Sequence, residues 1–425
     1  MAKKIVVCCD GTWNDPKTET NIFRTFEFLK GCLGVADSAG RGRGNKTCAG
    51  TARDGSPVSL YYDSGVGSGE HKIEEWLGGA TGAGLSQNVQ EAYRFVAEQY
   101  VPGAEVYVFG FSRGAYTARS LCGFIKVSGL LVNPSKEDVV TLYLTTYAVH
   151  NPLLGNSRTP TVAERLRGLG SLILGQAAGI FGSPLKNANK HPNVSIRFLG
   201  VYDTVGALGI PLPNAAGVND TIVGFHDTTL SSIVQHSVHA LAADEKRGPY
   251  VPTLWTMPLG ASLPPGQSSL QVWFPGVHSD IGGGYAPERG IGDHTLLFMM
   301  GQAAKRGLVI DPSRPLPTPS KPLEALPPQH ESLNSTWTIV NKFNLVANGP
   351  REISRTTVDP TSNQRVAVAG EVRMHKLLAD RIGEKVRVLS TDNKSDKEKE
   401  SDLPNSPVKY SLASGKQEML AVFDA

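Results

Sequence analysis

A serine between two glycines is the residue of this sequence best placed to do chemistry. Gly110-Phe111-Ser112-Arg113-Gly114 has the form G-x-S-x-G and directly follows the apolar run at residues 105–109. Residues 115–125 then show the apolar spacing of a helix. In a nucleophile elbow the serine occupies a strained turn between a strand and a helix, and the glycines let neighbouring backbone pass without a Cβ clash. This context favours Ser112 as a nucleophile over an ordinary turn.

A nucleophilic serine needs a histidine to take its proton and an acid to orient that histidine. In hydrolases with this elbow the chain order is serine, acid, histidine. Asp203 directly follows the apolar run at residues 198–202, and His278 follows residues 272–274, ahead of three consecutive glycines. We therefore predict His278 as the base and Asp203 as its acid. Asp280 is the competing acid because it lies two residues from His278, although it could instead brace the loop or bind a cation.

Two other histidines have simpler interpretations. His236 and His239 are spaced as on a helix, and we expect them to be face or core residues.

The developing oxyanion needs backbone donors, usually the N–H after the nucleophile and one from a loop after an earlier strand. The N–H of Arg113 is the first, and that of Gly11 or Thr12, after the first apolar run, is the second. Asp10 either orients this loop or is a plain turn residue.

Four aspartates, Asp10, Asp15, Asp63 and Asp280, would suit a hard cation. No loop has a recognised ligand spacing, so we expect no metal and no other cofactor.

Strand and helix patterns alternate along the chain, which predicts βαβ units and an α/β fold with a mainly parallel central sheet flanked by helices. The last core strand is expected at residues 271–274. The other expected strands are 4–9, 58–62, 105–109 and 195–202, and the expected helices are 21–33, 86–99, 115–125 and 294–306.

The domain prediction is a catalytic domain at residues 1–310, with an inserted cap or lid at about 136–194. Within the cap, the apolar stretch 169–182 could line an acyl-chain site or simply pack on the main domain. At 14 residues this stretch is shorter than the roughly 18 that span a bilayer. Residues 311–425 are proline-rich and charged, which predicts a C-terminal extension that packs on the domain or trails from it.

Composition limits the partners and the compartment. A net charge of +3 argues against nucleic acid, and we expect the short basic cluster of Arg41, Arg43 and Lys46 to be a solvated loop. Five cysteines at spacings unlike a metal site are expected to be reduced core thiols. The N-terminus lacks the pattern of a secretory signal, so we expect synthesis in the cytoplasm, which is compatible with export by a signal-independent system.

Seven ordered motifs resemble the α/β-hydrolase-like catalytic domain of type VI secretion phospholipase effectors, the type-one lipase class, and the resemblance extends from about residue 4 to the helix after His294. These motifs are CDGTWND (9–15), YYDSGVG (61–67), GGATGAGLSQNVQEAYRFV (78–96), FGFSRGAYTARSL (109–121), VYDTVGALG (201–209), PTLW (252–255) and WFPGVHSDIGGGY (273–285). The resemblance implies a Ser-Asp-His hydrolase and adds weight to Ser112, Asp203 and His278. It also implies a lipid substrate, peripheral membrane contact, and an immunity or secretion partner.

The sequence thus predicts a serine hydrolase that cleaves carboxylic esters, of the phospholipase A or lipid esterase kind. Two alternatives stay open at this point: a soluble carboxylesterase for small or polymeric esters, and a non-catalytic binding protein that keeps the hydrolase fold. Because the net charge is near zero, any lipid contact has to depend on apolar surface.

Overall fold

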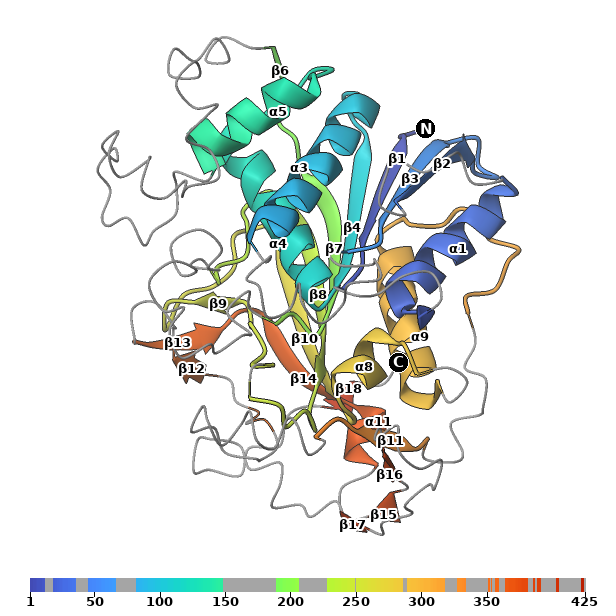
Figure 1. Ribbon diagram of the computed structural model, residues 1–425, viewed down its shortest axis with the longest axis vertical. Coiled ribbons are helices and arrows are strands. Elements are labelled where there is room, and N and C mark those ends of the chain that lie inside the picture. Colours follow the sequence, from blue (N-terminus) through green and yellow to red (C-terminus); the bar gives the residue numbers. More distant parts are fainter. Residues whose placement is uncertain are drawn as a thin grey trace.

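A nine-stranded sheet forms the centre of the molecule (Figure 1). Its strands in chain order are β1 (Lys4–Cys9), β2 (Lys46–Thr51), β3 (Pro57–Asp63), β4 (Glu105–Phe111), β7 (Ile196–Tyr202), β8 (Val234–Ala242), β10 (Ser268–Phe274), β14 (Glu371–His375) and β18 (Val422–Phe423). In space they lie in the order β18-β14-β10-β8-β7-β4-β1-β3-β2. Every neighbouring pair is parallel except β2 and β3, which are antiparallel. The sheet is therefore mixed, with its antiparallel strand at one edge.

The computed structural model describes only part of the chain. The described residues are 1–11, 18–35, 45–65, 82–147, 189–205, 228–248, 250–285, 289–317, 327–333, 351, 353, 356–358, 364–380, 385–386, 388–390, 403–404 and 422–423.

Helices cover both faces of the sheet (Figure 1). Helices α3 (Gly82–Gln99) and α4 (Arg113–Ser128) pack on one face, and α1 (Asn21–Leu33) and α9 (Gly290–Lys305) pack on the other. Strand β1 shows why two cores form. Its side chains alternate, so that Ile5 and Val7 enter the α3–α4 core while Val6 and Cys8 enter the α1–α9 core. A strand buried on both faces is expected to be continuously apolar, as this one is.

The predicted helix at residues 21–33 is confirmed, together with its end. Thr20 caps α1 by accepting a hydrogen bond from the amide of Phe23, and Gly34 follows in the left-handed region at φ 64°. Ile22 and Phe26 lie on the buried face of this helix.

The smaller elements surround the central sheet. Strands β9 (Thr256–Met257), β12 (Thr356–Val358) and β13 (Arg365–Val368) form an antiparallel sheet, and β5 (Leu130–Leu131) pairs with β6 (Lys190–His191). Strand β11 (Gln329–Glu331) pairs with β16 (Val388–Ser390), and β15 (Lys385–Val386) pairs with β17 (Leu403–Pro404). The short helices are α5 (Lys136–Leu142), the π-helix η2 (Tyr143–Tyr147), α8 (His278–Gly282) and α11 (Lys376–Ala379).

The predicted cap is described only at its two ends. Helix α5 opens it with a capping box, in which Ser135 and Asp138 bond each other's backbone amides. The stretch 169–182 lies outside the described residues. Among the described residues no helix is long and apolar enough to cross a membrane.

Three sequence-based expectations are wrong. The segment around His236 and His239 is strand β8, not a helix. Because this strand is buried on both faces of the sheet, its sequence lacks the apolar–polar alternation that distinguishes a strand from a helix. Residues 271–274 belong to β10 but are not the last core strand, because β14 and β18 extend the sheet beyond it. Lys46 begins strand β2 rather than lying in a loop, whereas Arg41 and Arg43 lie outside the described residues.

Several described parts of the C-terminal extension pack on the domain. Strand β14 pairs in parallel with β10, and β13 pairs with β9. Ile353 is buried with Trp273 and Met374 in a third apolar cluster. All five cysteines are free thiols, and all except Cys32 are buried.

Candidate active site

Ser112 occupies the turn between β4 and α4. Its φ of 56° and ψ of −124° are rare for a residue with a side chain, and its amide donates to the carbonyl of Tyr202 at 3.1 Å. The flanking glycines make this turn possible. A Cβ on Gly114 would lie 2.2 Å from the carbonyl oxygen of Cys9, and one on Gly110 would lie 2.5 Å from the Cα of Ala115. The structure thus gives the G-x-S-x-G sequence the strand, the strained turn and the helix that were predicted for it.

Asp203 lies at the end of β7, the strand next to β4. It too has a positive φ, 38°, and it is fully buried. Its amide donates to the carbonyl of Ala240 at 2.7 Å, and its Oδ1 accepts from the amide of Ala242 at 3.0 Å. Strand β8 therefore holds both the backbone and the carboxylate of Asp203.

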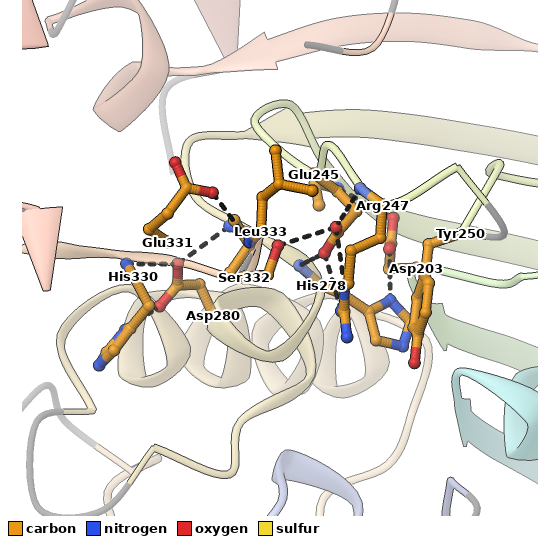
Figure 2. A network of polar contacts seen from close by, with 12 residues as sticks. Asp203, Glu245, Arg247, Tyr250, His278, Asp280, His330, Glu331, Ser332 and Leu333 are labelled. Atoms are coloured by element: carbon orange, nitrogen blue, oxygen red, sulfur yellow. Dashed lines mark hydrogen bonds and ion pairs between the residues drawn. The ribbon is translucent and has the colours of Figure 1, made fainter. Parts of the chain in front are cut away.

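His278 is the first residue of α8 and lies against Asp203 (Figure 2). Its Nδ1 is 2.6 Å from Oδ2 of Asp203. The imidazole packs between Phe111 and Tyr250, with ring centroids 4.7 and 4.9 Å away. Because Phe111 directly precedes Ser112, the imidazole lies beside the elbow.

Burial and neighbouring charges set the protonation of this pair. Burial alone would raise the pKa of Asp203, but the guanidinium of Arg351 and the hydrogen bond from His278 overcome it and lower that pKa. Burial lowers the pKa of His278 and outweighs the opposing effect of Asp203. An ionised aspartate thus faces a neutral imidazole at neutral pH, as a general base requires.

Asp280 contacts a different histidine. Its Oδ1 is 2.6 Å from Nδ1 of His330, and its Oδ2 accepts from the amides of His330 at 3.0 Å and Val277 at 2.9 Å. Tyr285 stacks on His330 with ring centroids 3.7 Å apart. The structure brings Asp203, not Asp280, to His278, and Asp280 instead links α8 to His330 in β11.

Sequence reasoning missed three charged residues around this site. Arg351 places Nη1 2.5 Å from Oδ1 of Asp203 and Nη2 3.0 Å from Oδ2. Glu245 accepts from the amide of His278 at 3.1 Å and from Arg247, whose guanidinium lies over the ring of Tyr250 (Figure 2). Arg351 is 148 positions from Asp203 and carries no local motif, so nothing in the sequence links the two.

Asp10 directly follows β1, and its carboxylate accepts hydrogen bonds from three neighbouring residues. Its Oδ1 accepts from the amide of Gly11 at 2.8 Å, and its Oδ2 accepts from the hydroxyls of Thr20 at 2.5 Å and Tyr62 at 2.8 Å. Asp10 therefore links the end of β1 to Thr20 at the start of α1 and to Tyr62 in β3. The amide of Gly11 is already engaged, so it can bind an oxyanion only if it leaves Asp10.

Of the other two predicted donors, Arg113 is the first residue of α4, and Thr12 lies outside the described residues. Among the described residues no three His, Cys, Asp or Glu side chains are grouped as metal ligands. Asp63 accepts from the amide of Gly65 and from Asn88, and Asp15 lies outside the described residues.

Comparison with known families gives a match over most of the chain. The family described as "T6SS, Phospholipase effector Tle1-like, catalytic domain" matches residues 3–302. The chain belongs to this family. The Tle1-like match includes Ser112, Asp203 and His278, whereas His330 and Arg351 lie beyond it.

Individual relatives are distant. An uncharacterized protein of Saccharomyces cerevisiae, YEL023C, is 26% identical over 286 residues, which make up 60% of this chain and 34% of that protein. The chain thus spans about a third of the length of this curated relative.

Solved structures align loosely with the chain. An uncharacterized protein from Pseudomonas aeruginosa is 18% identical, with a TM-score of 0.34, over 72% of this chain and 46% of that one. The Tle1 effector bound to the VgrG spike of the type VI secretion system is 19% identical, with a TM-score of 0.31, over 68% and 52%. A butyrate-bound esterase from Thermogutta terrifontis, Est2, is 11% identical, with a TM-score of 0.32, over 72% and 84%.

Proposed function

We propose that this chain is a serine ester hydrolase of the α/β-hydrolase type, acting on lipid esters in the manner of a phospholipase A. One observation carries the proposal: a buried carboxylate lies 2.6 Å from the imidazole of His278, which packs on the residue before a strained G-x-S-x-G serine. Ser112, Asp203 and His278 follow the parallel strands β4, β7 and β10 of the mixed sheet, in the chain order expected for such enzymes.

In the proposed reaction Ser112 attacks the acyl carbonyl and His278 takes its proton at Nε2. Asp203 accepts the hydrogen bond from Nδ1, fixes the tautomer and stabilises the imidazolium. The amide of Arg113 and a second amide from the loop after β1 stabilise the oxyanion. The imidazolium then protonates the departing alcohol. Water hydrolyses the acyl-enzyme with the same histidine as base, which returns Ser112 to its starting state.

The lipid substrate is supported by the family, which is described by its phospholipase effectors. We propose on the same basis that the chain contacts membranes peripherally and that its protein partners are secretion and immunity proteins. A soluble carboxylesterase is the competing function, since it would use the same three side chains.

A fluorophosphonate probe tests the nucleophile, because it reacts covalently with an activated serine. We expect the wild type to be labelled and to hydrolyse acyl esters. Ser112→Ala should lose both properties, whereas Ser313→Ala, at an exposed serine of the extension, should keep both. Equal activity of Ser112→Ala and wild type would disprove the proposal and favour the non-catalytic alternative.

A concentration series separates the two hydrolase functions. For a lipid esterase, the rate on a phospholipid should rise sharply above the concentration at which the lipid forms micelles. A rate that saturates on monomeric short-chain esters, with no such rise, would identify a soluble carboxylesterase instead.

A further inference from the structure

The described hydrogen bonds of the Arg351 guanidinium all go to atoms around the candidate site. Besides its two contacts with the carboxylate of Asp203, Nη1 donates to the carbonyl of Ala242 at 3.0 Å and Nη2 donates to that of Tyr250. The side chain is 7% exposed and that of Asp203 is fully buried. A planar guanidinium on both oxygens of a carboxylate fixes the orientation of the carboxylate as well as its charge.

We propose that Arg351 is a positioning residue for catalysis: it holds the carboxylate of Asp203 in the plane that presents Oδ2 to His278. This inference rests on the proposed function, since it assigns Arg351 a role in the same triad. It also gives the C-terminal extension a part in the chemistry, because Arg351 lies beyond the matched residues 3–302.

The two carboxylate oxygens of Asp203 have different hydrogen-bond partners. Oδ1 is held by the amide of Ala242 and by Nη1 of Arg351, while Oδ2 is shared by Nδ1 of His278 and Nη2 of Arg351. Among the described contacts of the carboxylate, loss of Arg351 would leave the amide of Ala242 and His278 itself to orient it. The imidazole would then be held by a group with more rotational freedom.

The segment that carries Arg351 is itself fixed to the domain. The amide of Arg351 donates to the carbonyl of Ala243 at 3.3 Å, in the segment that directly follows β8. Two residues later Ile353 is buried with Leu241 and Trp273. The position of the guanidinium therefore follows from packing of the extension on β8 and β10.

Charge gives a measurable signature of this role. The charged and titratable neighbours of Asp203 are Arg351 in the extension, His278 in α8 and His239 in β8. The other such neighbours of His278 lie in the segment after β8 and are Glu245, Arg247 and Tyr250. The positive charge of Arg351 opposes proton binding by the Asp203–His278 pair. Removing it makes the pair easier to protonate, so activity should be lost at a higher pH on the acid side.

Three variants of the full chain test the inference through kcat, KM and the pH profile of ester hydrolysis. Arg351→Met removes charge and geometry, and Arg351→Lys keeps the charge but cannot make the two-nitrogen contact. Arg373→Met is the matched control, because Arg373 is another arginine of the extension and pairs with Glu371 at the surface.

We expect kcat to fall roughly 10- to 100-fold in both Arg351 variants, with KM little changed. The acid limb should move up by roughly half to one pH unit in Arg351→Met and stay near that of the wild type in Arg351→Lys. The control should match the wild type.

Two outcomes separate the failure of this inference from that of the proposed function. If folded Arg351→Lys and Arg351→Met match the control in kcat and acid limb while Ser112→Ala is inactive, Arg351 is not a positioning residue and the hydrolase proposal stands. If Arg351→Met does not fold, an unchanged kcat in Arg351→Lys still overturns the inference. Activity in Ser112→Ala overturns the proposed function instead.

Discussion

Two residues at the candidate site adopt backbone conformations that are rare for residues other than glycine. Ser112 and Asp203 both have positive φ, and each comes directly after a strand of the central sheet. Such conformations cost on the order of 1–3 kcal/mol each and persist only where the surroundings impose them. Here the amide of Ser112 is held by β7 and that of Asp203 by β8. The neighbouring strands therefore hold both conformations in place, at the carboxyl ends of β4 and β7.

A methyl group added at Gly114 would test whether the elbow requires this close packing of the backbone. In Gly114→Ala the new Cβ would lie 2.2 Å from the carbonyl oxygen of Cys9, a backbone atom that cannot move aside cheaply. We expect a loss of roughly 2–3 kcal/mol in the free energy of unfolding, and loss of fluorophosphonate labelling. Urea denaturation and probe labelling measure the two effects.

The matched control is Gly301→Ala on α9, where a Cβ meets nothing within 4 Å. It should leave labelling intact and stabilise the helix by up to about 1 kcal/mol. Similar behaviour of the two variants would contradict the role given to Gly114.

The order of the strands explains how distant residues meet at the site. Five neighbouring strands of the sheet are parallel: β1, β4, β7, β8 and β10. Their carboxyl ends therefore lie at the same end of the sheet. The segments that follow them carry Asp10, Ser112, Asp203, Glu245 and His278. In open parallel sheets, binding and catalytic groups lie at the carboxyl ends of the strands. One topological fact therefore brings together residues separated by up to 268 positions (278 minus 10).

Helix α8 takes part in two carboxylate–histidine contacts, that of His278 with Asp203 and that of Asp280 with His330, and substitutions in the two have different expected consequences. Asp203→Asn should lower kcat by roughly 10³- to 10⁴-fold, because the amide favours the wrong tautomer of His278. Asp280→Asn should lower kcat less than about tenfold but destabilise the fold by roughly 1.5–3 kcal/mol, because it weakens the link to His330. Steady-state kinetics and thermal unfolding separate the two. The reverse ranking of kcat would make Asp280 the acid.

Local patterns predicted the parts of the fold that depend on local sequence. The first strand, helix α1 with Gly34, and the β4–α4 elbow follow from apolar runs and glycine positions, and Asp203 and His278 follow from their places after strands. Strand β8 was mistaken for a helix because burial on both faces removes the alternation of a strand. Arg351 and the pairing of β14 with β10 depend on long-range packing, which no window of sequence contains.

At the scale of the whole molecule, described segments of the C-terminal extension pack on the central sheet. These segments add β14 and β18 to the central sheet and bury Met374 against Trp273. They also supply Arg351 and His330 to the loops that follow β7 and β10. Removal of the extension would expose one side of β10 and leave a buried carboxylate without its cation. The stability of the fold and the geometry of the site thus depend on the same segments.

Buried neutral histidines make the fold sensitive to acid. Burial lowers the pKa of His239 to about 3 and that of His375 to about 3. Each ring accepts a backbone N–H, from Thr204 at 3.0 Å and Leu377 at 3.2 Å, and a protonated ring could not accept it. In the unfolded chain both titrate near 6.5. Below that pH the unfolded state binds more protons, so stability falls as the pH drops from about 6.5 toward 3.

Each of these histidines contributes a slope that approaches roughly 1.4 kcal/mol per pH unit below pH 6. We expect the free energy of unfolding, measured by urea titration, to fall as the pH drops from 6.5 to 5, with a contribution per histidine that rises from about 0.7 kcal/mol per pH unit at pH 6.5 toward about 1.4 at pH 5. His239→Gln keeps an oxygen that can accept from Thr204 but does not titrate, so its slope should be smaller by about the share of one histidine. If the variant and the wild type lose stability in parallel over this range, His239 is not held neutral by the fold, and burial within β8 does not set its charge.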